Sequence, residues 1–89
     1  MTDRITPERA EILALEALAW LAGQPEAIER FLALSGIGAA DLRRAAGDRD
    51  LLVSLFDFLL TNEALLLSFC QDASTSPKVV HMARYRLEA

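Results

Sequence analysis

Hydrophobic residues recur along almost the whole chain at the three- and four-residue spacing of amphipathic helices, and no stretch alternates with the two-residue period of a strand. Capping and turn residues divide this pattern into segments that we expect to be helices: residues 7–22, 25–35, 39–46, 49–60, 62–72 and 77–87. A chain of 89 residues has room for one hydrophobic core. The sequence therefore predicts an all-α fold, a compact bundle of five to six short helices, with residues 1–89 in a single domain.

The ends of the predicted helices carry capping signals. Thr6 and Asp48 each precede a helical pattern, and their side-chain oxygens can accept a hydrogen bond from the first turn. Gly23 is expected to end the first helix in the left-handed conformation. No glycine follows the helix over 62–72, so its end is predicted less sharply. Residues 73–76 are expected to be a linker to the last helix, and residues 1–5 to be disordered.

Several predicted helices are hydrophobic over more of their circumference than one buried face requires. In the helix over 49–60 the apolar arc spans roughly 220°, compared with about 100° for an ordinary surface helix. The chain can hide such faces by packing its helices against one another, or it can expose part of them to bind a second copy, as in a homodimer, or another protein. We favour an interaction module, and the residues expected to form its interaction surface are Trp20, Leu52, Phe56, Leu59 and Leu66.

Composition and charge exclude several other classes of protein. The chain is 53% hydrophobic, which excludes disorder over most of its length, and its net charge of −4 disfavours nucleic acid as a partner. The apolar stretch from Ile12 to Ala22 follows Glu11 and contains Glu16, and both secretory signals and membrane spans lack such charges. We therefore expect a cytoplasmic protein that does not enter a membrane.

Residues suited to catalysis or metal binding are sparse. The one histidine, His81, has no carboxylate three or four residues away. The one cysteine, Cys70, lies in an apolar run that is typical of a core, and no metal-ligand spacing occurs. We expect no enzymatic activity, no metal and no cofactor.

One short motif points to nucleic acid. Gly36, Ile37 and Gly38 form a glycine–hydrophobic–glycine turn that resembles the turn of helix-hairpin-helix proteins, in which backbone amides approach a DNA phosphate. Asp41 departs from that pattern by placing a negative charge close to the phosphate position, and Ile37 filling a gap between two helices also explains the segment. A DNA-binding accessory protein is therefore our alternative hypothesis.

Several short sequence segments, in their order along the chain, resemble those of a known family. These segments are residues 17–23, 30–36, 41–43, 57–60, 62–66 and 69–70. Together they resemble a family of short, uncharacterised proteins, grouped as a domain of unknown function and found mostly in alphaproteobacteria. The resemblance runs from the first helix to Cys70 and implies a compact helical fold in a bacterial cytoplasm. It implies no activity, substrate or catalytic residue.

Overall fold

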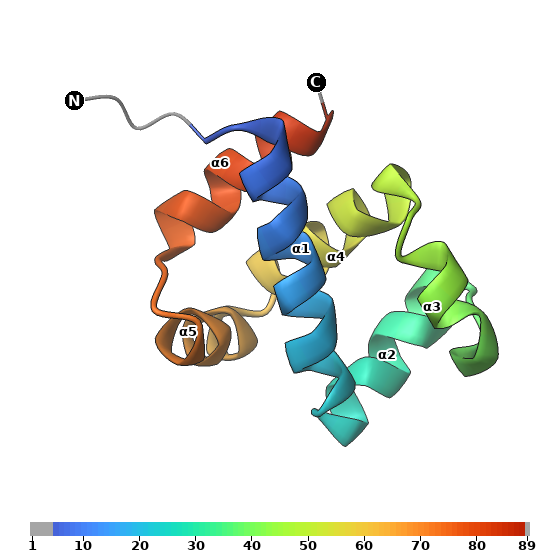
Figure 1. Cartoon of the computed structure of the whole chain (residues 1–89). Coiled ribbons are helices and arrows are strands. Elements are labelled where there is room, and N and C mark those ends of the chain that lie inside the picture. Colours follow the sequence, from blue (N-terminus) through green and yellow to red (C-terminus); the bar gives the residue numbers. More distant parts are fainter. Residues whose placement is uncertain (1–4, 89) are drawn as a thin grey trace.

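The computed structural model describes residues 5–88, whose arrangement is shown in Figure 1. No strand occurs within this range, and the predicted all-α fold is confirmed. Residues 1–4, most of the segment expected to be disordered, lie outside the described range, whereas Ile5 is half-buried and packs against the core. The elements are α1 (Pro7–Ala22), α2 (Pro25–Ser35), the 3-10 turn η1 (Ala39–Asp41), α3 (Leu42–Ala45), α4 (Arg49–Leu60), α5 (Glu63–Asp72) and α6 (Pro77–Glu88).

Three helices, α1, α4 and α6, form the centre of the fold. Each of them packs against the other two, and their mutual contacts are the most extensive in the molecule. Helices α2 and α5 pack on α4 from different sides, with α5 at the lower left and α2 at the lower right of Figure 1. The start of α1 and the end of α6 lie at the same end of the molecule (Figure 1). This arrangement makes α4 the helix that the others surround.

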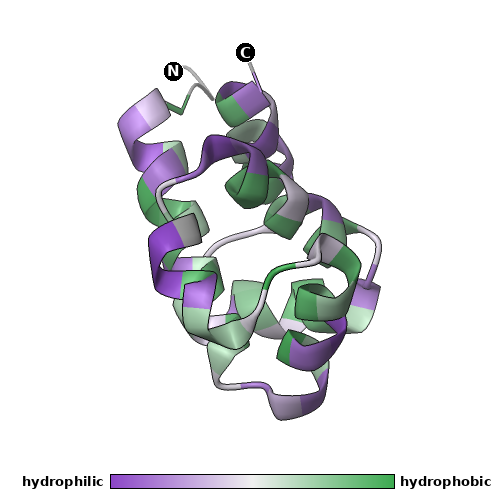
Figure 2. Ribbon diagram, turned by 90° about the vertical axis from the view of Figure 1, so that its right-hand side faces the viewer, coloured by the Kyte–Doolittle hydropathy of each residue, from purple (hydrophilic) through white to green (hydrophobic). Residues whose placement is uncertain are grey.

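The wide apolar arc of α4 follows from this central position, because a helix that is covered from several sides needs hydrophobic residues on several sides. By contrast, α1 buries a narrower face that includes three alanines, Ala10, Ala14 and Ala17, each with no exposed surface. Their small side chains let α1 approach its neighbours closely. In Figure 2, hydrophobic and hydrophilic residues alternate in bands along the helices. The buried residues of α4 are Leu51, Leu52, Leu55, Phe56, Phe58 and Leu59.

The predicted helix starts are confirmed by the capping hydrogen bonds. The backbone amide of Arg9 donates to Oγ1 of Thr6 at 3.2 Å, and that of Asp50 donates to a carboxylate oxygen of Asp48 at 3.0 Å. The left-handed conformation predicted for Gly23 is wrong, because this residue has φ −88° and ψ 3°. Its amide instead bonds to the carbonyl oxygens of the last turn of α1, which ends the helix with a right-handed turn.

Helix α5 ends in a Schellman motif without glycine. Ser74 takes the left-handed conformation, with φ 54°. The amide of Thr75 donates to the carbonyl oxygen of Cys70 at 2.9 Å, and the amide of Ser74 donates to that of Gln71 at 3.4 Å. Residues 73–76 then lead directly into α6, where Oγ of Ser76 accepts a hydrogen bond from the amide of Val79 at 3.3 Å. The predicted linker is therefore a short, hydrogen-bonded connection.

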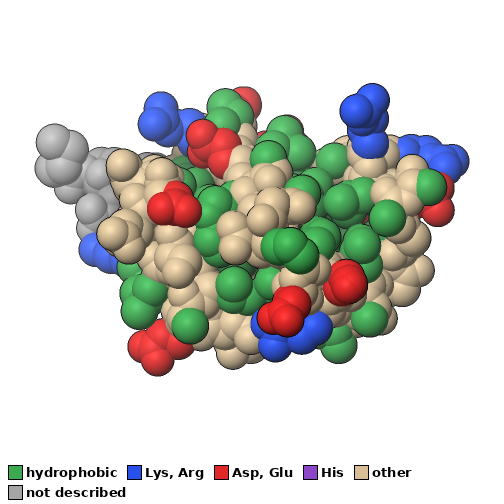
Figure 3. All heavy atoms as spheres, turned by 90° about the horizontal axis from the view of Figure 1, so that it is seen from below, with side chains coloured by type: hydrophobic (Ala, Val, Ile, Leu, Met, Phe, Trp, Pro, Cys, Tyr) green, Lys and Arg blue, Asp and Glu red, His purple; other side chains and the backbone are tan. Residues whose placement is uncertain are grey.

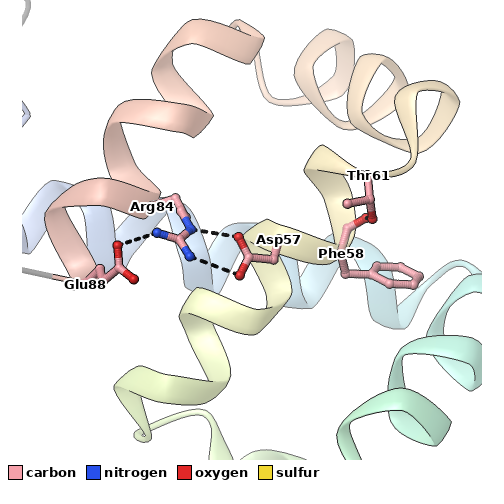
Figure 4. Close-up of polar contacts among 5 residues, drawn as sticks. All are labelled: Asp57, Phe58, Thr61, Arg84 and Glu88. Carbon is pink, nitrogen blue, oxygen red and sulfur yellow. Dashed lines mark hydrogen bonds and ion pairs between the residues drawn. The ribbon is translucent and has the colours of Figure 1, made fainter.

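Two polar contacts join helices that are distant in sequence. Arg84 on α6 forms a two-pronged ion pair with Asp57 on α4, with its Nε 2.7 Å and its Nη2 3.2 Å from the two carboxylate oxygens, and it also bonds Glu88 (Figure 4). Trp20 on α1 donates from its Nε1 to Asp72 at the end of α5, at 2.8 Å. These contacts fix α6 on α4 and α1 on α5.

Candidate docking surfaces

Four of the five residues expected to form an interaction surface lie in the core. Leu52, Phe56, Leu59 and Leu66 are at most 7% exposed, so the prediction of an interaction surface is corrected at these positions. Leu52, Phe56 and Leu59 are hidden because other helices surround α4, and Leu66 is hidden because α5 packs on α4 and α6. The fifth residue, Trp20, is half-buried. Its ring meets Phe69 edge to face, with 5.6 Å between the ring centroids.

The large apolar side chains that are exposed in the described part of the chain lie on helices other than α4. They are spread over α1, α2, α5 and α6, and Figure 3 shows hydrophobic side chains reaching the surface among scattered charges on the face seen from below. Single exposed apolar residues are normal on a protein surface, so only those that share a surface feature point to a site. The exposed residues are Ile12 (56%), Leu15 (43%), Leu34 (76%), Leu67 (51%) and Tyr85 (68%).

Two of these residues belong to one apolar stripe on α1. Ile12, Leu15, Ala19 and Ala22 are all exposed and follow one another at steps of three, four and three residues, which places them along one side of the helix. This side lies opposite the buried alanines of the same helix. We call these four residues the α1 outer face. The sequence analysis noted the wide apolar surface of this helix but did not separate its inner from its outer residues.

Carboxylates border the α1 outer face. Glu8, Glu11 and Glu16 are exposed, and Arg9 is the only cation among the residues of α1. Glu11 and Glu16 lie on opposite flanks of the stripe at 100° per residue. The face therefore combines an apolar centre with a predominantly acidic border.

A hollow of about 330 Å³ adjoins this face between α1 and the start of α6. Ile12 and Glu16 line it from α1, and Val79 lines it from α6, so the exposed stripe continues into a depression. A groove next to an apolar stripe lets a partner side chain be enclosed on more than one side, which increases the apolar area removed from water.

A second feature is a groove of about 240 Å³ between α2 and α4, which we call the α2–α4 groove. It contains the apolar rings of Phe31 and Phe58, whose centroids are 5.5 Å apart with an angle of 57° between the ring planes. Figure 4 shows Phe58 directed toward α2, while Asp57 points away from it toward Arg84. The residues lining the groove are Phe31, Leu34, Ser35, Ser54, Asp57, Phe58 and Thr61.

The polar groups around this groove are largely engaged within the chain. The Thr61 hydroxyl donates to the carbonyl oxygen of Phe58 at 3.0 Å, and the Ser35 hydroxyl donates to that of Leu32 at 3.2 Å. Asp57 is held by Arg84, and the hydrogen bonds from Arg84 to Asp57 and Glu88 raise the pKa of the guanidinium above its ordinary value. The groove is therefore suited to an apolar group rather than to an ion.

The glycine turn does not assemble into a helix-hairpin-helix site of the expected kind. Gly36 is left-handed, with φ 74°, and Ile37 is half-buried against the core. The elements that follow, η1 and α3, contain only three and four residues, so they offer little aligned dipole to a phosphate. Arg44 is paired with Asp41 at 2.6 Å. The turn is thus explained by packing and by local pairing.

The described part of the chain contains no group of three or more His, Cys, Asp and Glu residues that could hold a metal ion. Cys70 is buried, and this burial raises the pKa of its thiol. His81 is exposed on α6. Within residues 5–88 no single helix is long and apolar enough to span a membrane, and only α4 and α5 together, bent by 108°, reach that length and composition.

These features define a small helical protein with exposed apolar surface features. Residues 7–89 match the model of the family described as "Protein of unknown function (DUF3572)", and the chain belongs to this family. The searches among curated proteins and among solved structures found no match. The resemblance to an uncharacterised family is thereby confirmed, and it now extends through α6 as well.

Proposed function

We propose that this chain is a protein-interaction module and that it binds its partner through the α1 outer face. The observation that carries the proposal is the exposure of Ile12 and Leu15 on one stripe of a helix whose other side is fixed in the core. A rigid helix loses little conformational freedom when it binds, so apolar contacts made by it convert efficiently into affinity.

The charges around the face indicate the chemistry of the partner. Glu11 and Glu16 flank the stripe, so a partner with lysine or arginine residues around an apolar centre gains both burial and ion pairing. Two copies of the chain are a weaker match for this face, because its border carries three carboxylates, Glu8, Glu11 and Glu16, and one cation, Arg9, so most of the facing charges would be alike. We therefore assign the α1 outer face to a different protein with a basic, amphipathic docking segment.

Affinity capture tests the proposal. A lysate of the source organism is passed over the immobilised, tagged chain. Three forms of the chain are compared: the wild type, the double variant Ile12→Ser/Leu15→Ser, and the control Leu67→Ser, which removes an exposed leucine from α5. We expect a protein that the wild type and the control retain and that the double variant loses. Its retention should also weaken as salt rises from about 50 to 500 mM, because exposed ion pairs are screened.

The comparison between the variants decides the outcome. If the wild type, the double variant and the control all retain the same lysate proteins, the α1 outer face does not bind a partner. If the control loses the partner while the double variant keeps it, the docking surface lies on α5 instead. Circular dichroism of each variant establishes that the helices are intact.

A further inference from the structure

The hollow between α1 and the start of α6, which we call the α1–α6 hollow, has walls of two chemical kinds. Ile12, Leu13 and Val79 supply apolar surface, and Glu16 supplies a carboxylate. Glu16 is exposed, and it has no ion-pair partner among residues 5–88. Glu11, on the opposite flank of the α1 outer face, does not line the hollow. Of these two flanking carboxylates, Glu16 is therefore the one that adjoins a recessed apolar surface.

A recess with apolar walls and a carboxylate suits a side chain that is apolar along its length and positively charged at its end. Lysine and arginine have this form, because their methylene stems can lie on apolar surface while the charged group stays at its edge. A cavity of about 150 Å³ takes up benzene, and the α1–α6 hollow measures about 330 Å³, so it has room for such a side chain. We propose that a lysine or arginine of the partner's docking segment lies in the α1–α6 hollow with its charge at Glu16. This inference rests on the proposed function and names the type of residue that anchors the partner.

The other charged residue of the hollow, Arg9, determines which way this side chain points. Arg9 precedes Glu16 by seven residues, so the two lie on one side of α1 and about 10.5 Å apart along the helix axis. The guanidinium of Arg9 repels a cation and the carboxylate of Glu16 attracts it, so the charged end of the occupant is directed toward Glu16. Glu8 and Glu11 also border this side of the molecule, so the local field favours a cation over an anion.

The two flanking carboxylates should therefore contribute unequally to binding. An ion pair on open surface contributes little because water screens it, whereas an ion pair beside a recess is screened less. We expect Glu16→Gln to lower the affinity for the partner about 10-fold, and the matched control Glu11→Gln to lower it less than about 3-fold. Both variants are compared with the wild type in the capture assay, with the retained partner quantified against the concentration of the chain.

A titration with a small probe tests the hollow without the partner. The probe is propylguanidinium, which reproduces the side chain of arginine, and its controls are the uncharged propylurea and the anion butanoate. Each compound is added at millimolar concentrations to the isotope-labelled full chain, and the amide chemical shifts are followed. We expect propylguanidinium to shift the amides of residues 12–16 and 73–79 saturably and more than either control does. Glu16→Gln should remove this preference, and Glu11→Gln should keep it.

The capture assay and the titration together distinguish this inference from the proposed function. Suppose that a partner is captured through Ile12 and Leu15. If Glu11→Gln and Glu16→Gln then weaken its capture equally, or if the probe shifts no amides around the hollow, this inference is wrong and the proposed function stands. Tighter binding of butanoate than of propylguanidinium in the hollow has the same meaning. If no partner is captured through Ile12 and Leu15, the proposed function fails and this inference fails with it.

Discussion

Helices α4 and α1 both carry more hydrophobic surface than one buried face requires, but other helices cover α4 on more sides than they cover α1. Helix α4 lies between other helices, and six of its twelve residues are buried. Helix α1 buries one side, and its opposite side presents Ile12 and Leu15 to solvent. The width of an apolar arc therefore does not by itself identify a binding surface. A part of the arc is exposed only where no other helix packs against it.

The largest effect is expected where α4 is enclosed. Phe56→Ala should lower the free energy of unfolding by about 3–5 kcal/mol, because it removes a fully buried ring and leaves a cavity. Leu34→Ala, which truncates an exposed side chain, is the control and should change this free energy by less than about 0.5 kcal/mol. Urea denaturation followed by circular dichroism measures both. Equal effects of the two variants would show that α4 is not the enclosed helix.

A smaller effect is expected at Trp20, which lies between the inner and outer sides of α1. Trp20→Phe removes the hydrogen bond from Nε1 to Asp72 but keeps an aromatic ring beside Phe69, so we expect a loss of about 0.5–1.5 kcal/mol. Asp72→Asn retains an oxygen acceptor and should have a smaller effect. The same urea titration compares the two, and a larger effect of Asp72→Asn would contradict this role of the hydrogen bond.

The burial of Cys70 on α5 should make the free energy of unfolding depend on pH. Burial raises the pKa of Cys70, so the neutral thiol is favoured in the folded state and the unfolded chain ionises at lower pH. The resulting stabilisation is fully present below the pKa of the unfolded thiol and is lost as pH rises through the folded pKa. Wild type should therefore lose more stability than Cys70→Ala between pH 7 and 10. Identical slopes of unfolding free energy against pH would contradict this.

The smallest effect on stability is expected on the α1 outer face. The double variant Ile12→Ser/Leu15→Ser should change the free energy of unfolding by less than about 1 kcal/mol, since Ile12 and Leu15 keep 56% and 43% of their surface exposed in the folded chain. A thermal melt compared with that of the wild type measures this change. A loss of several kcal/mol would place these residues in the core and would remove the basis for a docking face.

The helices could be predicted from the sequence because their ends are marked locally. Pro7, Pro25 and Pro77 open three helices, and α1, α2 and α4 end where the pattern placed their ends. The end of α5 was less sharply predicted because a serine, Ser74, adopts the left-handed conformation that usually marks a glycine. Local signals of this kind depend only on a few neighbouring residues.

The candidate surfaces could not be predicted in the same way. Leu52 and Ile12 are equally hydrophobic members of wide apolar arcs, and only the position of other helices makes one buried and the other exposed. The α2–α4 groove brings together Phe31 and Phe58 from two different helices, and the residue spacing within either helix does not predict this contact. The signal that was available on α1 is the stripe at steps of three, four and three residues, which lies opposite three alanines.

The most direct test of the α1 outer face is photo-crosslinking in cells of the source organism. A photoreactive phenylalanine analogue is placed at position 15, on this face, and in a separate variant at position 67, on α5. We predict a crosslinked product between the chain and a different protein from position 15 and none from position 67. A product from position 67 alone, or no product from either position, would contradict the assignment of α1 as the docking helix.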